Sequence, residues 1–176
     1  MNRKITMGLV AAIAAQFFIL LGMYVKAQIP LWTGQPILVK TVPVDPRSLF
    51  RGNYAQLSYP FSLLDKSLFN NRHALRQGEV VYVGLQKKDS GLYDFASVSL
   101  EKPHSGVFLK GRIASLGVWG ATDKYRVDYG IEAYFAPKEK ALALEEQLRI
   151  GAVAELMVTK NGQVSLRVVR GAKGNQ

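Results

Sequence analysis

Cysteine is absent from the 176 residues of this chain, and histidine occurs only twice, at His73 and His104. The protein therefore has no disulfides, no thiolate metal ligands and no cysteine nucleophile or lipid attachment point. Two histidines are too few for a zinc site built on several histidines, and glycine-rich phosphate loops and G-x-S-x-G are missing as well. The sequence predicts no metal and no cofactor, and it names no reaction.

Acidic residues are scarce, with 13 Asp and Glu against 23 Lys and Arg, which makes the net charge +10. Such a balance favours anionic partners, among them lipid headgroups, cell-envelope polymers and nucleic acid. The basic residues are scattered, however, and Lys87-Lys88 is the only adjacent pair after Lys4. Nucleic-acid binding would need clustered charge interleaved with aromatic residues, so we expect no nucleic-acid partner.

Charge is missing altogether from the 21 residues Ile5–Val25, which Arg3 and Lys4 precede and Lys26 follows. As a helix this stretch is about 30 Å long, the thickness of the hydrocarbon core of a bilayer. The positive-inside rule puts the N-terminus in the cytoplasm and the rest outside. We therefore expect a single-pass membrane protein whose main domain lies outside the cytoplasm; for a bacterial protein, the source that the resemblance described below implies, this means the inner membrane and a periplasmic domain.

A cleaved signal peptide is the alternative, because Val25-Lys26-Ala27 loosely resembles a cleavage site. The apolar stretch is longer than a signal peptide requires, so an uncleaved signal-anchor is favoured. The expected organisation is a cytoplasmic and transmembrane segment at 1–26, a linker at 27–34, an exported β-rich domain at 35–171 and a flexible tail at 172–176.

Alternating polar and apolar residues dominate after the anchor and predict about eight strands. The expected strands are 35–42, 54–59, 79–86, 92–100, 107–115, 124–135, 152–159 and 163–170. Asn161-Gly162 predicts a tight hairpin, because both residues accept positive φ. Pro137 and Gly151 bracket an amphipathic helix, whereas 62–77 is ambiguous. The predicted fold is mainly β: a small antiparallel barrel or sandwich with one packed helix.

Two separated blocks carry a resemblance. Residues 43–59 read PVDPRSLFRGNYAQLSY, and residues 129–137 read YGIEAYFAP. They resemble the GDYxxLxY domain family of membrane-anchored bacterial proteins, whose patterns are P-x-D-P-R with F-R-G-D-Y-x-x-L-x-Y, and F-G-I-E-R-Y-F-V-P-E. The chain departs from them at Asn53, Ala133 and Lys138, where the family commonly has Asp, Arg and Glu.

The resemblance implies an envelope module with a membrane partner, since genes of the family often neighbour or fuse with multispanning membrane proteins. It implies no activity. Asn53 in place of the motif's aspartate means that this position is not an obligatory acid or base.

The residues of the two blocks carry our site prediction. Pro43 and Pro46 make a stiff corner around Asp45, and Glu132 falls on the polar side of a predicted strand. If the blocks meet in space, Arg51 or Arg47 can pair with Glu132. The candidate binding residues are Asp45, Arg47, Arg51, Asn53, Tyr54, Tyr59, Glu132 and Tyr134.

Several interpretations stay open. Asp45, Arg51 and Glu132 can form a structural ion-pair network, or they can line a cleft for a peptide, glycan or polar headgroup. We expect an interaction or stabilising module for a multispanning membrane protein, anchored in the bilayer through Ile5–Val25. The alternatives are a ligand-binding or sensing domain, and an envelope hydrolase using Asp45 and Glu132.

Overall fold

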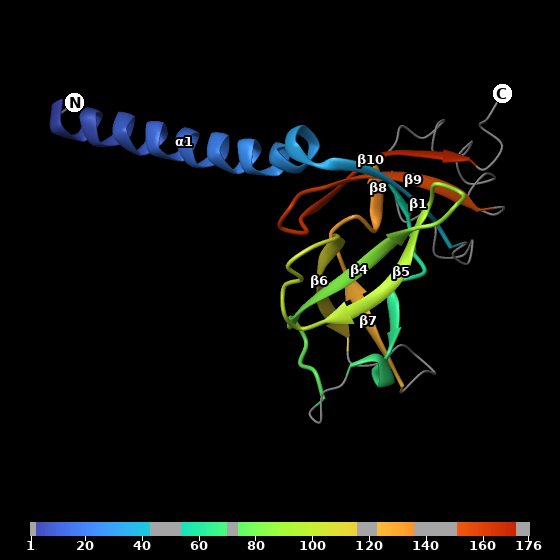
Figure 1. The fold of residues 1–176 in the computed structure, drawn as a ribbon. Helices are drawn as coiled ribbons and strands as arrows, with labels where there is room; N and C mark the ends of the chain where they lie inside the picture. Colours follow the sequence, from blue (N-terminus) through green and yellow to red (C-terminus); the bar gives the residue numbers. More distant parts are fainter. Residues whose placement is uncertain (1–2, 43–53, 70–73, 116–122, 136–150, 172–176) are drawn as a thin grey trace.

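The computed structural model describes residues 3–42, 54–69, 74–115, 123–135 and 151–171, which form an N-terminal helix and a β domain (Figure 1). The prediction of a mainly β fold behind one apolar helix is confirmed. The helix is α1 (Arg3–Thr33), and a short 3-10 turn, η2, spans Lys66–Leu68. The strands are β1 (Gln35–Lys40), β2 (Tyr54–Gln56), β3 (Leu63–Asp65), β4 (Val80–Lys87), β5 (Tyr93–Ser99), β6 (Val107–Ser115), β7 (Lys124–Asp128), β8 (Ala133–Phe135), β9 (Ala152–Val158) and β10 (Val164–Gly171).

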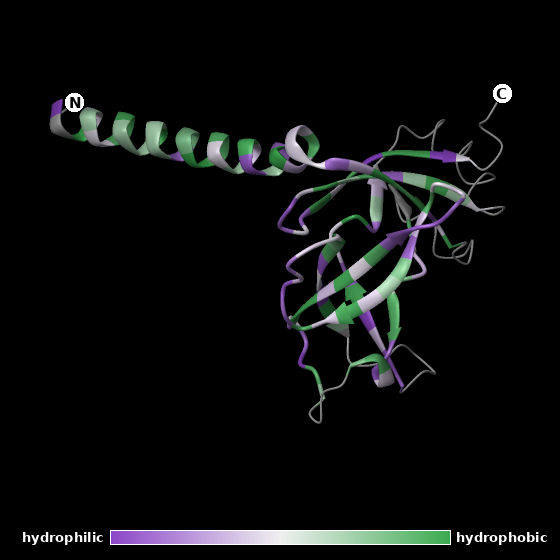
Figure 2. Cartoon of the chain, in the orientation of Figure 1, coloured by the Kyte–Doolittle hydropathy of each residue, from purple (hydrophilic) through white to green (hydrophobic). Residues whose placement is uncertain are grey.

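Helix α1 contains the predicted span Ile5–Val25 and continues without interruption to Thr33. It projects away from the β domain, and its surface is apolar over nearly its whole length (Figure 2). None of its most apolar stretch is buried inside the protein, and the helix is long and apolar enough to cross a membrane. The segment 27–34, expected to be a linker, is helical as far as Thr33.

The junction between α1 and the β domain is short and closely packed. Pro30 lies within the last turn, where the Gly34 N–H donates to its carbonyl over 3.0 Å and the Thr33 hydroxyl donates to the Ile29 carbonyl over 2.9 Å. A Cβ added at Gly34 would lie 2.4 Å from the Pro30 oxygen and 2.9 Å from the Val158 nitrogen. Only glycine permits this approach, so the helix end is held against β9.

The β domain is built on one eight-stranded sheet in the order β10-β9-β1-β5-β4-β6-β7-β3. Strand β1 is antiparallel to β9 but parallel to β5, through the pair Val39 and Tyr93. The other neighbours in the sheet are antiparallel. The sheet curls into a half-barrel around a core that includes Val39, Phe61, Leu109 and Leu156, all of which are fully buried.

Most strands lie close to their predicted positions, and β6 has the predicted bounds. The prediction of one strand over 124–135 is wrong. The chain forms β7, bends at Tyr129 and Gly130, and resumes as β8. Gly130 has φ +82°, which is incompatible with a continuous strand. The ambiguous stretch 62–77 contains β3 and η2. Phe69, the residue after η2, packs edge-on against the Tyr125 ring.

The predicted hairpin is confirmed: it joins β9 and β10, and Thr159 pairs with Gln163 across the turn 160–162. Gly162 alone has positive φ, +77°, and its N–H donates to the Thr159 carbonyl. This is a type I turn closed by a left-handed glycine, whereas a two-residue turn would need Asn161 at positive φ too. The Lys110 N–H donates to the Gly162 carbonyl over 2.8 Å, so the turn also packs on β6.

The predicted helix between Pro137 and Gly151 falls almost entirely on residues 136–150, outside the described part of the chain. Gly151, its expected C-cap, has φ +97°.

Candidate functional site

The described parts of the two sequence blocks, residues 54–59 and 129–135, lie side by side, as predicted. Strand β2 from the first block is antiparallel to β8 from the second, with Ala55 opposite Tyr134. The Leu57 N–H donates to the Glu132 carbonyl over 2.7 Å and extends this pairing. Segments about 70 residues apart in the sequence thus form one local structure beside the main sheet.

Buried aromatic side chains pack where the two blocks meet. The rings of Tyr59 and Phe61 stack with centroids 5.3 Å apart, and Tyr129 meets Phe61 edge-on at 5.4 Å. The Tyr59 hydroxyl donates to the Ile131 carbonyl over 3.0 Å, and the Tyr129 hydroxyl donates to the Phe61 carbonyl over 2.7 Å. Each tyrosine therefore buries its ring, and its hydroxyl donates to a distant backbone carbonyl: Tyr59 to the second block, and Tyr129 to Phe61, two residues after the first block.

Glu132 holds the bend between β7 and β8. Its Oε1 accepts the Tyr129 N–H over 2.6 Å, and its Oε2 accepts the Gly130 N–H over 2.9 Å. The prediction that Glu132 lies on the polar face of a strand is therefore wrong, because its carboxylate folds back onto its own bend. The reason is local: Gly130 bends the chain, and the carboxylate accepts hydrogen bonds from the two N–H groups that the bend leaves without strand partners.

The electrostatics of this cluster favour neutral tyrosines. Burial raises the pKa of the Tyr59 hydroxyl above its ordinary value, and the charge of Glu132 raises it further. Burial likewise raises the pKa of Tyr129, with smaller contributions from Glu132 and Asp128. Both hydroxyls are hydrogen-bond donors at neutral pH, and neither is a candidate base.

Four of the candidate residues, Asp45, Arg47, Arg51 and Asn53, lie outside the described residues, so the Arg51–Glu132 pairing stays a prediction. Tyr54 is described by its backbone in β2. Tyr59, Glu132 and Tyr134 come together around the β2–β8 pair, where Tyr134 is half-buried against the core.

A groove of about 590 Å³ borders the second block. Residues 110–114 of β6 and residues 128–130 of the bend line two of its sides, and Gln77, Gly78 and Gln163 complete it. Lys110 and Arg112 bring positive charge to this groove and Asp128 brings negative charge. Arg112 donates to the Gly78 carbonyl over 2.9 Å, and Asp128 lies 3.5 Å from Arg126.

No motif in the sequence marks the groove residues as a set. The alternation in 107–115 does place Lys110 and Arg112 on one face of the strand. The glycine between them, Gly111, is typical of a position where another segment or a ligand approaches the strand closely. What brings Gln77, Asp128 and Gln163 to the same groove is the order of the strands, which no local pattern encodes.

The described part of the site can be examined for metal ligands and for free carboxylates. Within the described residues, no group of three or more His, Asp or Glu side chains is placed to hold a metal ion. Both oxygens of Glu132 already accept backbone N–H groups. The charged side chains of the groove, Lys110, Arg112 and Asp128, are able to form hydrogen bonds or ion pairs with a polar ligand.

Comparison with known proteins agrees with the pattern of the two blocks. No curated protein and no solved structure matches the chain. The model of one family, described as GDYXXLXY protein, matches residues 16–169, which include the second half of α1 and nearly all of the β domain. The chain belongs to the GDYXXLXY protein family.

Proposed function

We propose that this protein is a membrane-anchored recognition module that binds and stabilises a multispanning protein of the bacterial inner membrane. In this proposal α1 is an uncleaved signal-anchor, its N-terminus lies in the cytoplasm and the β domain lies in the periplasm. Arg3 and Lys4 before the span support that orientation. Continuity of the helix across Ala27, the residue after which a signal peptidase would cut, supports retention of the anchor.

The observation that carries the proposal is the junction at Gly34. Because α1 ends against β9 with no flexible linker, the β domain is held at the membrane surface. Its reach is limited to lipids and to the exposed parts of membrane proteins. A sensor of soluble ligands or an enzyme acting on distant polymers would gain nothing from so short a connection.

The groove beside the second block is the proposed contact surface. The groove includes Gln163, which belongs to the β9–β10 turn. Thr159 and Lys160 of the same turn line a recess together with Thr33, the last residue of α1. The groove therefore lies close to the end of the anchor. Lys110 and Arg112 favour a partner that presents carboxylate or carbonyl oxygens. An acidic periplasmic loop of a multispanning protein has this chemistry and lies at the right height.

A ligand-binding or sensing domain is the second candidate, because a groove of about 590 Å³ has the size of a small-molecule site. A hydrolase using Asp45 and Glu132 has less support. Glu132 is engaged by two backbone N–H groups, and a general acid or base needs a carboxyl oxygen directed at substrate.

Site-specific photo-crosslinking in intact membranes tests the proposal. A photoreactive amino acid is introduced at Gln77 or Gln163 in the groove, or at Gln86 as a matched exposed control on β4. Adducts with an integral membrane protein at both groove positions but not at Gln86 are expected. Equal adducts at all three positions, or none in the groove, would refute the proposed surface.

The orientation has its own test. A mature N-terminus at Gln28 would show that the segment is a cleaved signal. Protection of the β domain from protease in intact spheroplasts would place it in the cytoplasm. Copurification of a dialysable small molecule with the detergent-solubilised chain would favour the ligand-binding alternative.

A further inference from the structure

The length of α1 fixes the height of the β domain above the bilayer. Its apolar stretch Ile5–Thr33 has 29 residues, and at 1.5 Å per residue a helix of this length reaches about 44 Å. The hydrocarbon core accounts for about 30 Å, and the full bilayer with its headgroups for about 40–45 Å. With Ile5–Val25 in the hydrocarbon core, Thr33 lies eight residues, or about 12 Å, beyond the core. Since each headgroup layer is about 5–8 Å thick, the helix ends just outside it.

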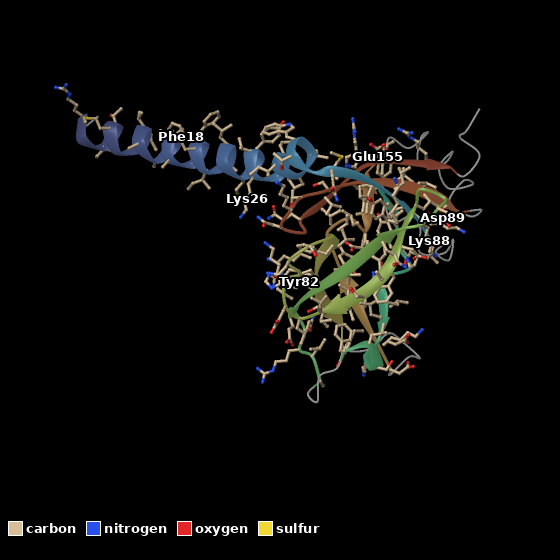
Figure 3. All side chains as sticks on the ribbon, in the orientation of Figure 1. Phe18, Lys26, Tyr82, Lys88, Asp89 and Glu155 are labelled. Carbon is tan, nitrogen blue, oxygen red and sulfur yellow. The ribbon has the colours of Figure 1, made fainter. Side chains whose placement is uncertain are left out.

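Aromatic residues in the last third of the helix agree with this depth. Tyr24 and Trp32 are 61% and 66% exposed, too much for residues that pack against the protein's own domain. Tyrosine and tryptophan are enriched at the headgroup level of membranes. Lys26 lies between them, and its side chain leaves the helix on the side where the β domain lies (Figure 3).

The part of the β domain closest to Thr33 must lie at the same depth. A recess of about 160 Å³ is lined by Thr33 and Gln35, by Gly106–Phe108 at the start of β6, and by Val158–Lys160 at the β9–β10 turn. This edge carries exposed lysines. Lys160 lies in the turn itself, and Lys102 donates to the Asn161 side chain over 2.9 Å, which ties the β5–β6 loop to the turn.

We propose that Lys26, Lys102 and Lys160 form a headgroup-binding rim that docks the β domain on anionic phospholipids of the leaflet from which it emerges. Glu101 is the one acidic residue of the 100–106 loop and the 159–163 turn, so the rim is net positive. An ammonium group near an anionic surface gains about fivefold in binding per lysine. Docking would fix the tilt of the domain and hence the direction in which the groove faces.

This inference rests on the proposed crossing of the bilayer by α1, but not on a protein partner. The chain lacks cysteine, so a Ser105→Cys variant of the full-length protein accepts one fluorescent donor at the rim. It is reconstituted in nanodiscs whose lipids carry a headgroup acceptor, either in phosphatidylcholine alone or with about 30% phosphatidylglycerol. Energy transfer should rise with the anionic lipid and fall again in 0.5 M salt.

Lys102→Gln with Lys160→Gln should reduce the ratio of docked to undocked domains about 25-fold, at about fivefold per lysine. The matched control is Lys40→Gln with Lys87→Gln. Both lysines are exposed, and Lys40 lies five residues along β1 from the junction, about 17 Å away. Lys87 precedes Lys88 at the β4–β5 turn, which lies on the side of the domain opposite the helix (Figure 3).

The control pair should leave energy transfer unchanged, and all variants should melt at the wild-type temperature in detergent. Equal energy transfer on neutral and anionic nanodiscs, or an equal loss in the control pair, would overturn the proposal. Because these nanodiscs contain no partner membrane protein, failure of the rim is distinguishable from failure of the groove. Groove crosslinks in native membranes report on the latter.

Discussion

Replacing Glu132 by alanine removes both acceptors that hold the bend between β7 and β8. A hydrogen bond to a charged group contributes about 1.5–3 kcal/mol, and an exposed bond falls at the lower end or below. The Tyr129 N–H is partly buried and the Gly130 N–H is exposed. We therefore expect Glu132→Ala to lower the free energy of unfolding by about 2–4 kcal/mol.

Glu132→Gln keeps one of the two hydrogen-bond acceptors and removes the other. The amide keeps one carbonyl oxygen for one of the two N–H groups, but it turns an NH₂ group toward the other. Its cost should be at least half that of the alanine variant, because a neutral acceptor is weaker than a carboxylate and one N–H is left opposite a donor.

Urea denaturation of the full chain in mild detergent, followed by far-UV circular dichroism, measures both effects. Glu101→Ala, at an exposed position on the β5–β6 loop, is the control and should cost less than about 0.5 kcal/mol. A Glu132→Ala variant within 0.5 kcal/mol of wild type would refute the reasoning, because the bend would then not depend on its carboxylate. A stable variant that loses its groove crosslinks would instead make Glu132 part of the recognition surface.

Three other changes test the packing. Tyr59→Phe removes the 3.0 Å bond to the Ile131 carbonyl and should cost about 1 kcal/mol at pH 8. Since the fold holds the Tyr59 proton above the ordinary pKa of 10.0, Tyr59 should lower wild-type stability above pH 10 by up to about 1.4 kcal/mol per pH unit. Tyr129 adds its own fall to both proteins, so the variant's stability should fall less steeply than that of the wild type. Equal slopes in urea titrations from pH 8 to 11 would contradict this. Phe61→Leu loses two ring contacts and should lower the free energy of unfolding by about 1–3 kcal/mol in the same assay. An unchanged free energy of unfolding would mean that the ring contacts add nothing beyond apolar volume. Gly162→Ala places a side chain at a φ of +77° and brings its methyl group within 2.7 Å of the Phe108 ring. The substitution should therefore lower the melting temperature by several degrees. An unchanged melting temperature would show that the turn does not pack tightly on β6.

The elements that could be predicted from the sequence are those with a local physical cause. Twenty-one uncharged residues can satisfy their backbone in a membrane only as a helix, and α1 contains them all. Alternation over 107–115 predicted β6 residue by residue, since one face of that strand is buried. The hairpin at Gly162 follows from a glycine that accepts positive φ.

Other features follow the same local rules but were missed. The bend at Gly130 has its signal in the glycine itself and in a carboxylate two residues later, a pair that the alternating pattern around it obscured. The N-terminal helix is longer than predicted because Lys26 ends the uncharged stretch without ending the helix, which continues through Pro30 to Thr33. A proline removes one hydrogen bond near a helix terminus, and the last turn survives when it packs on the domain.

The sequence by itself determined the apolar N-terminal helix, most strands and the aromatic residues of the two blocks, because each depends on the chemistry of a few neighbouring residues. Only the tertiary structure decided that β1 lies between β5 and β9, and that Tyr59 reaches the backbone at Ile131. It also decided that Gln77, Lys110 and Gln163 share one groove. These contacts join distant segments, and their partners are selected by how the whole sheet buries its apolar face, which no short stretch of sequence specifies.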